Sequence, residues 1–192
     1  MARSKEFDPS AALDAALELF WERGYEGTSM ADLVERLGIG RASLYATFGG
    51  KHELYMKALQ RYLDAQSPSP VELLSQPGPA LPAVRQLVEM YARQSSSDEG
   101  KRGCMIVNAA AELMPRDEEV SRFVDRNWEG LETALTSALI RARAQGELAP
   151  DRDPRALARF LMVLLQGMRV MGKASADPAR MRDAAAHALS LL

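Results

Sequence analysis

The residues at positions 41 to 43 carry side chains that suit contact with nucleic-acid bases. Arg41 has a planar guanidinium whose paired donors fit the edge of a guanine or a phosphate. Ala42 and Ser43 are small, so a helix that carries them can approach the bases closely. The Ser43 hydroxyl can itself bond to a base edge or to a phosphate. These residue types in sequence indicate a surface suited to the major groove of DNA.

Three further donors follow in the next residues. Tyr45 and Thr47 present hydroxyl groups that can donate to phosphate oxygens. Lys51 stands where another helix is expected to begin, so its ammonium and the free backbone N–H groups can bind one phosphate together. Leu44 and Phe48 share a different face and are expected to point into the core. We therefore expect the first three positions to contact bases and these three donors to contact phosphates.

Two short helices separated by a glycine-rich turn are needed to position these side chains. A helix is predicted from about Ser29, because Ser29 and Asp32 have the spacing of a capping box. Gly38 ends this helix, and a second helix is predicted over about 41–47. A helix-turn-helix of this size places its second helix in the major groove while the first crosses the backbone. The same pattern is also compatible with two short helices that only build an all-α core.

Positive charge is concentrated around this segment, although the chain of 192 residues carries a net charge of −2. Residues 36–61 hold five basic residues and one acidic residue, whereas residues 6–35 hold eight acidic residues and one basic residue. Phosphate contacts depend on local charge more than on the total. The N-terminal arm adds Arg3 and Lys5, which either enter a minor groove or remain solvated.

The rest of the sequence predicts an all-α fold, because no segment alternates apolar and polar residues over the length of a strand. The stretch 67–82 contains five prolines and is predicted to connect an N-terminal unit with a larger C-terminal one. Further helices are expected at about 8–23, 51–66, 82–96, 103–114, 117–145, 153–173 and 177–191.

The run RGYEGTSMADLVERLGIGRASLYATFGGKHELY resembles the N-terminal domain of tetracycline-repressor-like (TetR) regulators. The resemblance rests on the aromatic-Gly pair, Thr-Ser before the second helix, Leu-Gly-Ile at the turn, Ser-Leu-Tyr in the third helix, and the later phenylalanine and lysine. Thr47 departs from the histidine that many relatives carry, but threonine can still donate to a phosphate. The resemblance implies DNA contacts by Ser29, Arg41, Ala42, Ser43, Tyr45, Thr47 and Lys51.

The resemblance also implies an architecture and a function. An N-terminal three-helix DNA-binding domain at 1–50 would precede a helical effector-binding and dimerisation domain at 51–192, with the helix 51–66 connecting them. The expected protein is a ligand-responsive regulator, most simply a repressor that a small-molecule effector releases from palindromic double-stranded operator DNA. The sequence leaves open the effector, the operator, and whether the protein represses or activates.

The last two predicted helices carry apolar surfaces that suit either a homodimer interface or the core of one chain. In the implied architecture they would pair with their two-fold copies. Leu161, Leu164 and Leu165 are expected to be divided between the two roles. The apolar positions are Leu157, Phe160, Leu161, Leu164, Leu165, Met168, Ala184, Ala185, Ala188, Leu189 and Leu192.

An effector pocket would be concave and mostly apolar, with a few polar groups. Methionines in the C-terminal part suit such a pocket because their side chains adapt to varied ligands. The same residues at helical spacing are also suited to an ordinary core. The candidate lining residues are Met90, Tyr91, Cys104, Met105, Asn108, Phe123, Trp128, Met162 and Gln166.

Cys104 offers an alternative mode of regulation, because it is predicted at the start of a helix just after Lys101 and Arg102. A helix N-terminus and nearby cations favour a reactive thiolate, and some members of the resembling family use such a cysteine. Cys104 would then sense oxidants or electrophiles. The simpler reading is a small side chain packed inertly, as is common for a free cysteine.

Several other classes of protein are disfavoured. No nucleophile–base pair, Gly-rich phosphate loop or metal-ligand spacing is evident, so we expect neither an enzyme nor a cofactor or metal. His52 and Glu53 are adjacent and expected to be solvated. A helical ligand-binding protein without operator binding would lack the basic focus at 36–61. We expect a soluble cytoplasmic protein without a membrane partner. The chain has a single cysteine, and no apolar run follows the N-terminal basic residues. The apolar stretch 156–171 is interrupted by polar residues.

Overall fold

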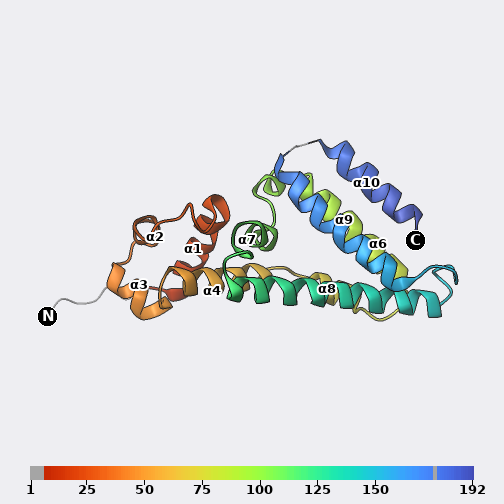
Figure 1. Ribbon diagram of the computed structural model, residues 1–192, viewed down its shortest axis with the longest axis horizontal. Helices are drawn as coiled ribbons and strands as arrows, with labels where there is room; N and C mark the ends of the chain where they lie inside the picture. Colours follow the sequence, from red (N-terminus) through yellow and green to blue (C-terminus); the bar gives the residue numbers. More distant parts are fainter. Residues whose placement is uncertain (1–6, 175–176) are drawn as a thin grey trace.

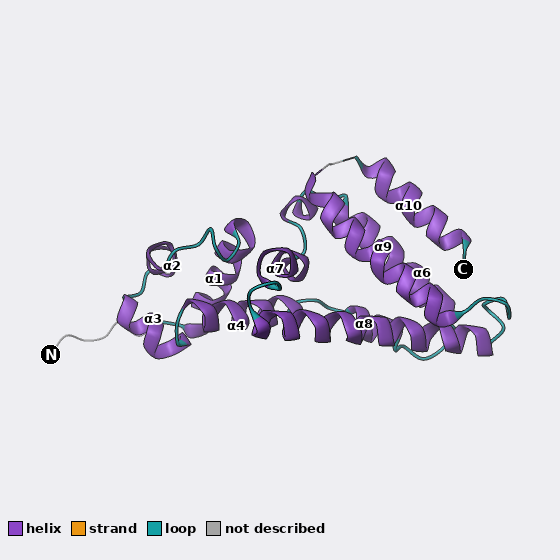
Figure 2. Cartoon of the chain, viewed as in Figure 1, coloured by secondary structure: helices purple, strands orange, loops and turns teal. Residues whose placement is uncertain are grey.

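The computed structural model describes residues 7–174 and 177–192, and every regular element within these ranges is a helix (Figure 2). The predicted all-α fold is therefore confirmed. The N-terminal arm with Arg3 and Lys5 lies outside the described residues. In chain order the elements are α1 (Pro9–Arg23), α2 (Met30–Leu37), α3 (Arg41–Phe48), α4 (Lys51–Asp64), α5 (Pro70–Leu74), α6 (Ala80–Ser95), the 3₁₀ helix η1 (Glu99–Arg102), α7 (Met105–Leu113), α8 (Glu118–Ala144), α9 (Pro154–Ala174) and α10 (Pro178–Ser190).

Local chemistry sets the ends of the N-terminal helices. Asp8 caps α1, and Pro9 is its first residue, where the missing N–H costs nothing. The side chains of Ser29 and Asp32 bond each other's backbone N–H groups at the start of α2, as their spacing predicted. Gly38 ends α2 with φ 65°, in the left-handed region that glycine adopts without strain. The ends of the helices in the helix-turn-helix are therefore set by the local sequence.

The buried apolar side chains form two clusters rather than one. The first joins α1, α2, α3 and α4 with α7 and the first turns of α8. The second joins α5, α6, the rest of α8, α9 and α10. Figure 1 shows α8 as the long helix that begins beneath α7 and continues under the lower ends of α6 and α9. Trp128, in the middle of α8, packs against both clusters.

The proline-rich stretch 67–82 does more than connect two units. It contains α5, whose start is closed by a second capping box between Ser69 and Glu72. Leu73 and Leu74 of this helix are buried in the C-terminal cluster. A five-residue helix is too short to show a 3.6-residue apolar period, which explains why periodicity did not predict it.

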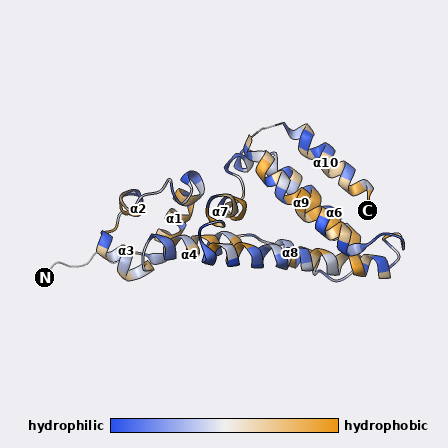
Figure 3. Ribbon diagram, viewed as in Figure 1, coloured by the Kyte–Doolittle hydropathy of each residue, from blue (hydrophilic) through white to orange (hydrophobic). Residues whose placement is uncertain are grey.

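The apolar surface of α9 is divided between two faces. Leu161, Leu165 and Met168 are buried in the core of the chain. Phe160 is 41% exposed and Val163 is 76% exposed. Figure 3 shows hydrophobic colouring along much of α9. Of the three leucines expected to be divided, Leu161 and Leu165 belong to the core, whereas Leu164 is half-buried at its edge.

Candidate nucleic-acid interface

The third helix has a buried side and a solvent-exposed side, as the sequence predicted. Leu44 is fully buried and Phe48 is nearly so. The two side chains anchor α3 in the N-terminal core, and the intervening residues face outward. The exposed positions of α3 are Arg41, Ala42, Ser43, Tyr45, Ala46 and Thr47. The predicted contact residues of this helix therefore lie together on one accessible surface.

Two cations of this surface lie against aromatic rings. The Arg41 guanidinium lies 5.8 Å from the centroid of the Tyr45 ring, one turn further along α3. The Lys51 ammonium lies 4.2 Å from the centroid of the Tyr25 ring. Such contacts orient a cation without neutralising it. Gly50 precedes α4 and provides no side-chain cap, so the first N–H groups of α4 can join Lys51 in binding a phosphate.

Ser29 occupies a different position from the other predicted contact residues. Its hydroxyl accepts a hydrogen bond from the Asp32 amide and donates one to the Asp32 carboxylate. The hydrogen bonds from Ser29 lower the pKa of Asp32, and Arg23 at 3.1 Å adds to this effect. The side chain is exposed, but its hydroxyl is already satisfied. A phosphate contact by Ser29 would compete with the capping box.

His52 is not simply solvated, which corrects the expectation from its position beside Glu53. Its Nε2 lies 2.8 Å from the Asp117 carboxylate, and its Nδ1 lies 3.9 Å from Glu119. Asp117 is the N-cap of α8 and accepts hydrogen bonds from two backbone N–H groups there. Burial raises the pKa of Asp117, but the Val120 amide and His52 outweigh burial and hold this pKa below its usual value. The pair joins the start of α4 to the start of α8.

A second link joins the turn after α1 to α7. The Glu112 carboxylate accepts hydrogen bonds from the backbone N–H groups of Tyr25 and Glu26, at 3.0 and 2.7 Å. The partners lie 87 and 86 residues apart in the chain, so no local pattern could predict them. Together with the His52–Asp117 pair, this carboxylate ties the helix-turn-helix to the C-terminal helices.

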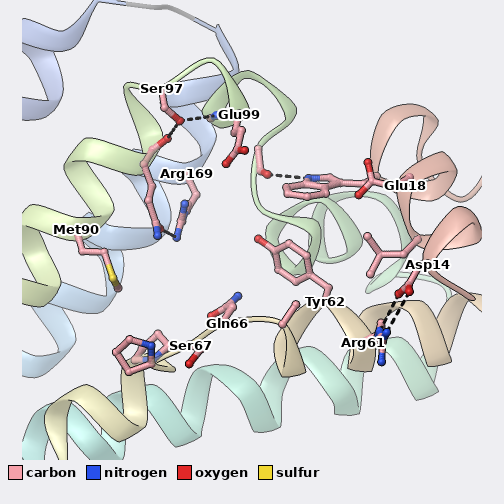
Figure 4. A pocket seen from close by; sticks show the side chains of 18 residues that line it. Asp14, Glu18, Arg61, Tyr62, Gln66, Ser67, Met90, Ser97, Glu99 and Arg169 are labelled. Atoms are coloured by element: carbon pink, nitrogen blue, oxygen red, sulfur yellow. Dashed lines mark hydrogen bonds and ion pairs between the residues drawn. The ribbon is translucent and has the colours of Figure 1, made fainter. Parts of the chain in front are cut away.

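A cavity of about 540 Å³ lies between α1, α4, η1, α6 and α9 (Figure 4). Figure 4 shows Tyr62 and Gln66 at its α4 side, Met90 on α6 and Arg169 on α9. Trp21 of α1 also lines the cavity, and its indole N–H donates to the Gly103 carbonyl at 2.9 Å. The volume is in the range of small-molecule sites.

Of the nine predicted ligand-binding residues, Met90 alone lines this cavity. Tyr91, Cys104 and Gln166 line a smaller neighbouring cavity of about 110 Å³. Asn108 lines a separate hollow beside Lys173. The other four pack in the core instead, since apolar side chains at helical spacing serve packing first: Met105, Phe123, Trp128 and Met162.

The sequence interpretation missed the polar residues of the cavity between α1, α4, η1, α6 and α9. Trp21, Tyr62, Gln94 and Arg169 come from four elements, and none of them belongs to a recognisable motif. An arginine inside an apolar helical run was the one available signal, because Arg169 interrupts the stretch 156–171. The same arginine also makes the stretch too polar for a membrane span.

Comparison with known proteins matches both the N-terminal and the C-terminal part of the chain to described families. Residues 12–58 match the family described as bacterial regulatory proteins, tetR family, and residues 80–188 match the tetracyclin repressor-like C-terminal domain. An uncharacterized HTH-type transcriptional regulator of Bacillus subtilis, YezE, is 39% identical over 100% of both chains. The HTH-type transcriptional repressor ComR of Escherichia coli is 32% identical, covering 98% of this chain and 90% of its own.

A solved structure extends the likeness to a DNA complex. A cysteine mutant of the TetR family transcriptional regulator CifR, complexed with 26-bp double-strand operator DNA, has a TM-score of 0.85 against this chain. Its sequence is 34% identical, and the match covers 98% of each chain.

The two parts of the surface should respond differently to mutation. Arg41→Ala should change the preferred base sequence, because it removes a donor pair suited to a base edge. Lys51→Ala should weaken binding to all sequences alike and reduce the slope of log K against log salt by about one, because it removes one phosphate contact. Fluorescence anisotropy on a set of DNA duplexes at several salt concentrations measures both. Identical behaviour of the two variants would contradict this division of roles.

The ion pair between His52 and Asp117 should contribute to the stability of the fold in a pH-dependent way. Because the folded-state pKa of Asp117 is lowered, its contribution exists above the unfolded pKa, near 4, and is lost as the pH falls through the folded pKa. Between about pH 6 and pH 3, urea unfolding should therefore show a larger loss of stability for wild type than for Asp117→Asn.

The alanine variant separates this charge effect from capping. Asp117→Asn retains an oxygen that can cap α8, whereas Asp117→Ala loses the cap and should be less stable than Asp117→Asn by about 1 kcal/mol at every pH. Equal pH dependence of wild type and Asp117→Asn is the result that rules out the proposed contribution.

Proposed function

The chain belongs to the TetR family of bacterial regulatory proteins, and from this membership we propose that it is a repressor released from operator DNA by a small-molecule effector. It is a DNA-binding regulator, as are its full-length relatives. The observation that carries the proposal is the exposed face of α3 beside the uncapped start of α4, where donors for bases and phosphates lie on one surface.

We assign roles within that surface. Arg41, Ala42 and Ser43 contact base edges, whereas Tyr45, Thr47 and Lys51 bind phosphates. The exposure of the residues from α3 and the inward position of Leu44 and Phe48 support these roles. Lys51 is half-buried and lies at the start of α4, which has no side-chain cap. Ser29 closes the capping box, and its contact with a phosphate is secondary to that role.

TetR family regulators act as dimers, and a dimer suits the proposed operator. Two copies related by a two-fold axis place their recognition helices about 34–36 Å apart, one turn of DNA, so that the operator is palindromic. We propose that α9 and α10 form the interface. The exposed apolar residues Phe160, Val163 and Val170 of α9 support this assignment, because large side chains of this kind are seldom grouped on a free surface.

The position of the cavity suggests how an effector acts. We propose 1–50 as the DNA-binding domain, with α4 leading from it into the effector-binding domain at 51–192. The cavity is lined by α1 and α4 on one side and by η1, α6 and α9 on the other. A ligand that fits one arrangement of these elements better shifts the equilibrium toward it. The shift moves α4, changes the separation of the two recognition helices, and lowers the affinity for the operator.

Regulation requires no chemistry by the chain itself. TetR family regulators are in general not enzymes, and we propose the same here. Among the described residues no group of three or more histidine, cysteine, aspartate or glutamate side chains is placed to hold a metal ion. Within the same residues, no helix has the length and apolar character needed to cross a membrane. Because the proposed target is chromosomal DNA, we place the protein in the cytoplasm.

The proposal is tested on the promoter beside the chain's own gene. The purified protein should bind one promoter fragment selectively in an anisotropy or gel-shift assay, with affinity that falls steeply as salt rises. Arg41→Ala should lose this preference while remaining folded by circular dichroism. If no promoter fragment is bound better than random DNA of equal length, the protein is not an operator-binding repressor.

Cys104 supports a second candidate function, a repressor that senses oxidants or electrophiles. The residue is buried and occupies the N-cap position of α7 without a side-chain capping hydrogen bond. Burial raises the pKa of Tyr62, and negative charge on the Cys104 sulfur raises it further, so Cys104 lies close to a residue that lines the cavity between α1, α4, η1, α6 and α9. The two cations expected to activate the thiol are engaged elsewhere, since Lys101 pairs with Asp98 and Arg102 with Glu18.

Substitution of the cysteine distinguishes the two mechanisms. If Cys104 is the sensor, N-ethylmaleimide or hydrogen peroxide should release operator DNA from the wild-type protein and leave the Cys104→Ser complex intact. A gel shift before and after treatment measures the release. Equal release from both proteins, or from neither, argues against thiol sensing.

A further inference from the structure

We propose that the cavity between α1, α4, η1, α6 and α9 selects an organic carboxylate, with Arg169 binding the carboxylate and aromatic side chains binding its apolar body. The inference rests on the proposed function, because it specifies the chemical class of the effector. Its basis is that Arg169 has no carboxylate partner among the described residues, whereas the neighbouring arginines are paired.

Arg169 is a partly desolvated cation with incomplete pairing. Its Nη2 donates to the side-chain oxygen of Gln94, and its guanidinium lies 4.3 Å from the centroid of the Tyr91 ring. Its Nε is buried and has no hydrogen-bond partner among the described residues. No carboxylate of those residues lies within ion-pair distance of it. A guanidinium that is partly desolvated and lacks a carboxylate partner favours an anionic ligand, which supplies the missing counter-charge.

Arg61, which lines the same cavity, and Arg102 beside it are each paired with a carboxylate. Arg61 makes two contacts with Asp14, at 2.8 and 3.0 Å. Arg102 lines the neighbouring hollow, lies 4.0 Å from the centroid of the Trp21 ring and pairs with Glu18 at 2.9 Å. Its Nε, like that of Arg169, is buried without a hydrogen-bond partner among the described residues, but its charge is balanced by Glu18. These ion pairs neutralise the carboxylates nearest to the cavity. Arg169 is therefore the cation that remains available to a ligand inside it.

One further acidic residue, Glu99, lines the cavity, but it is exposed. A solvated carboxylate is screened and opposes an anion only weakly at a distance. Figure 4 shows Glu99 and Ser97 near one another on the η1 side, while Tyr62, Gln66 and Met90 lie around the space that Arg169 faces. The charge of Arg169 thus acts within the interior of the cavity.

The remaining walls suit the apolar part of a small acid. The Trp21 and Tyr62 rings meet edge to face, with centroids 5.1 Å apart. Leu17 and Met90 add aliphatic surface. Gln66 can donate to a second oxygen of the ligand. An aromatic or alkyl monocarboxylate satisfies both parts of this site, whereas a neutral analogue leaves the Arg169 donor unpaired.

The position of Arg169 is fixed by a close helix crossing one turn further along α9. A Cβ at Gly172 would lie only 2.5 Å from the Ser95 carbonyl oxygen at the end of α6. Only glycine allows this approach, so α9 is held against α6 at that point. The same contact holds Arg169 beside Gln94, the residue before Ser95 in the chain.

Matched acid and amide pairs test the inference on the full-length, DNA-free protein. 3-Phenylpropionate and hexanoate are compared with 3-phenylpropionamide and hexanamide by isothermal titration calorimetry, with quenching of tryptophan fluorescence as a second readout. At least one acid should bind, and its amide should bind at least about ten-fold more weakly, as expected when a charge-assisted hydrogen bond is lost.

Variants assign the selectivity to Arg169. Arg169→Met should reduce the affinity for the acid to that for the amide. Arg169→Lys keeps the charge without the planar fork and should give an intermediate affinity, which serves as the test if the methionine variant does not fold. Arg155→Met, on the exposed start of the same helix, is the control and should bind the acid as wild type does.

The outcome is separable from that of operator binding. If neither acid binds, if acid and amide bind equally, or if Arg169→Met binds the acid normally, the inference is overturned. Operator affinity is measured on the same variants, and Arg169→Met should retain it while losing its response to the acid. Failure to bind any operator, with Arg169-dependent acid binding intact, would overturn the repressor function and leave the carboxylate site standing.

Discussion

The helices that present the proposed DNA-contacting surface complete their hydrophobic core on the C-terminal half of the chain. α2 and α3 have eight residues each, too few for a stable isolated helix, so they depend on tertiary packing. Their cluster includes Ile106 of α7 and Val120 and Val124 of α8, all nearly or fully buried. The orientation of the recognition helix is therefore tied to α7 and α8.

Around this shared core the two halves are joined by a small number of polar contacts. Glu112 holds the turn after α1, and Asp117 holds the start of α4 through His52. Two further contacts, from Trp21 to the Gly103 carbonyl and between Arg102 and Glu18, lie at the wall of the large cavity. A ligand in that cavity would touch the contacts that position the DNA-binding helices. Packed interfaces of this kind tend to move between discrete arrangements.

Sequence predicted the features that depend on neighbouring residues. Pro9, the Ser29–Asp32 capping box and Gly38 determine helix ends through local bonds, so their outcome follows from spacing. The cavity could not be predicted in this way, because its walls come from segments such as Trp21 and Gly103, 82 residues apart. Met90 and Tyr91 show why sequence alone does not predict which residues line a cavity. The two are consecutive on α6, so their side chains point about 100° apart, and they line two different cavities.

The large cavity draws on α1 and α4 but on no residue of α2 or α3. The residues proposed to select the ligand are thus distinct from those proposed to contact DNA. Substitutions at positions such as Gln94 or Met90 can alter which molecule is sensed while the operator preference stays the same, whether they arise in natural divergence or in the construction of a biosensor. The architecture separates the choice of signal from the choice of gene, so each can change without the other.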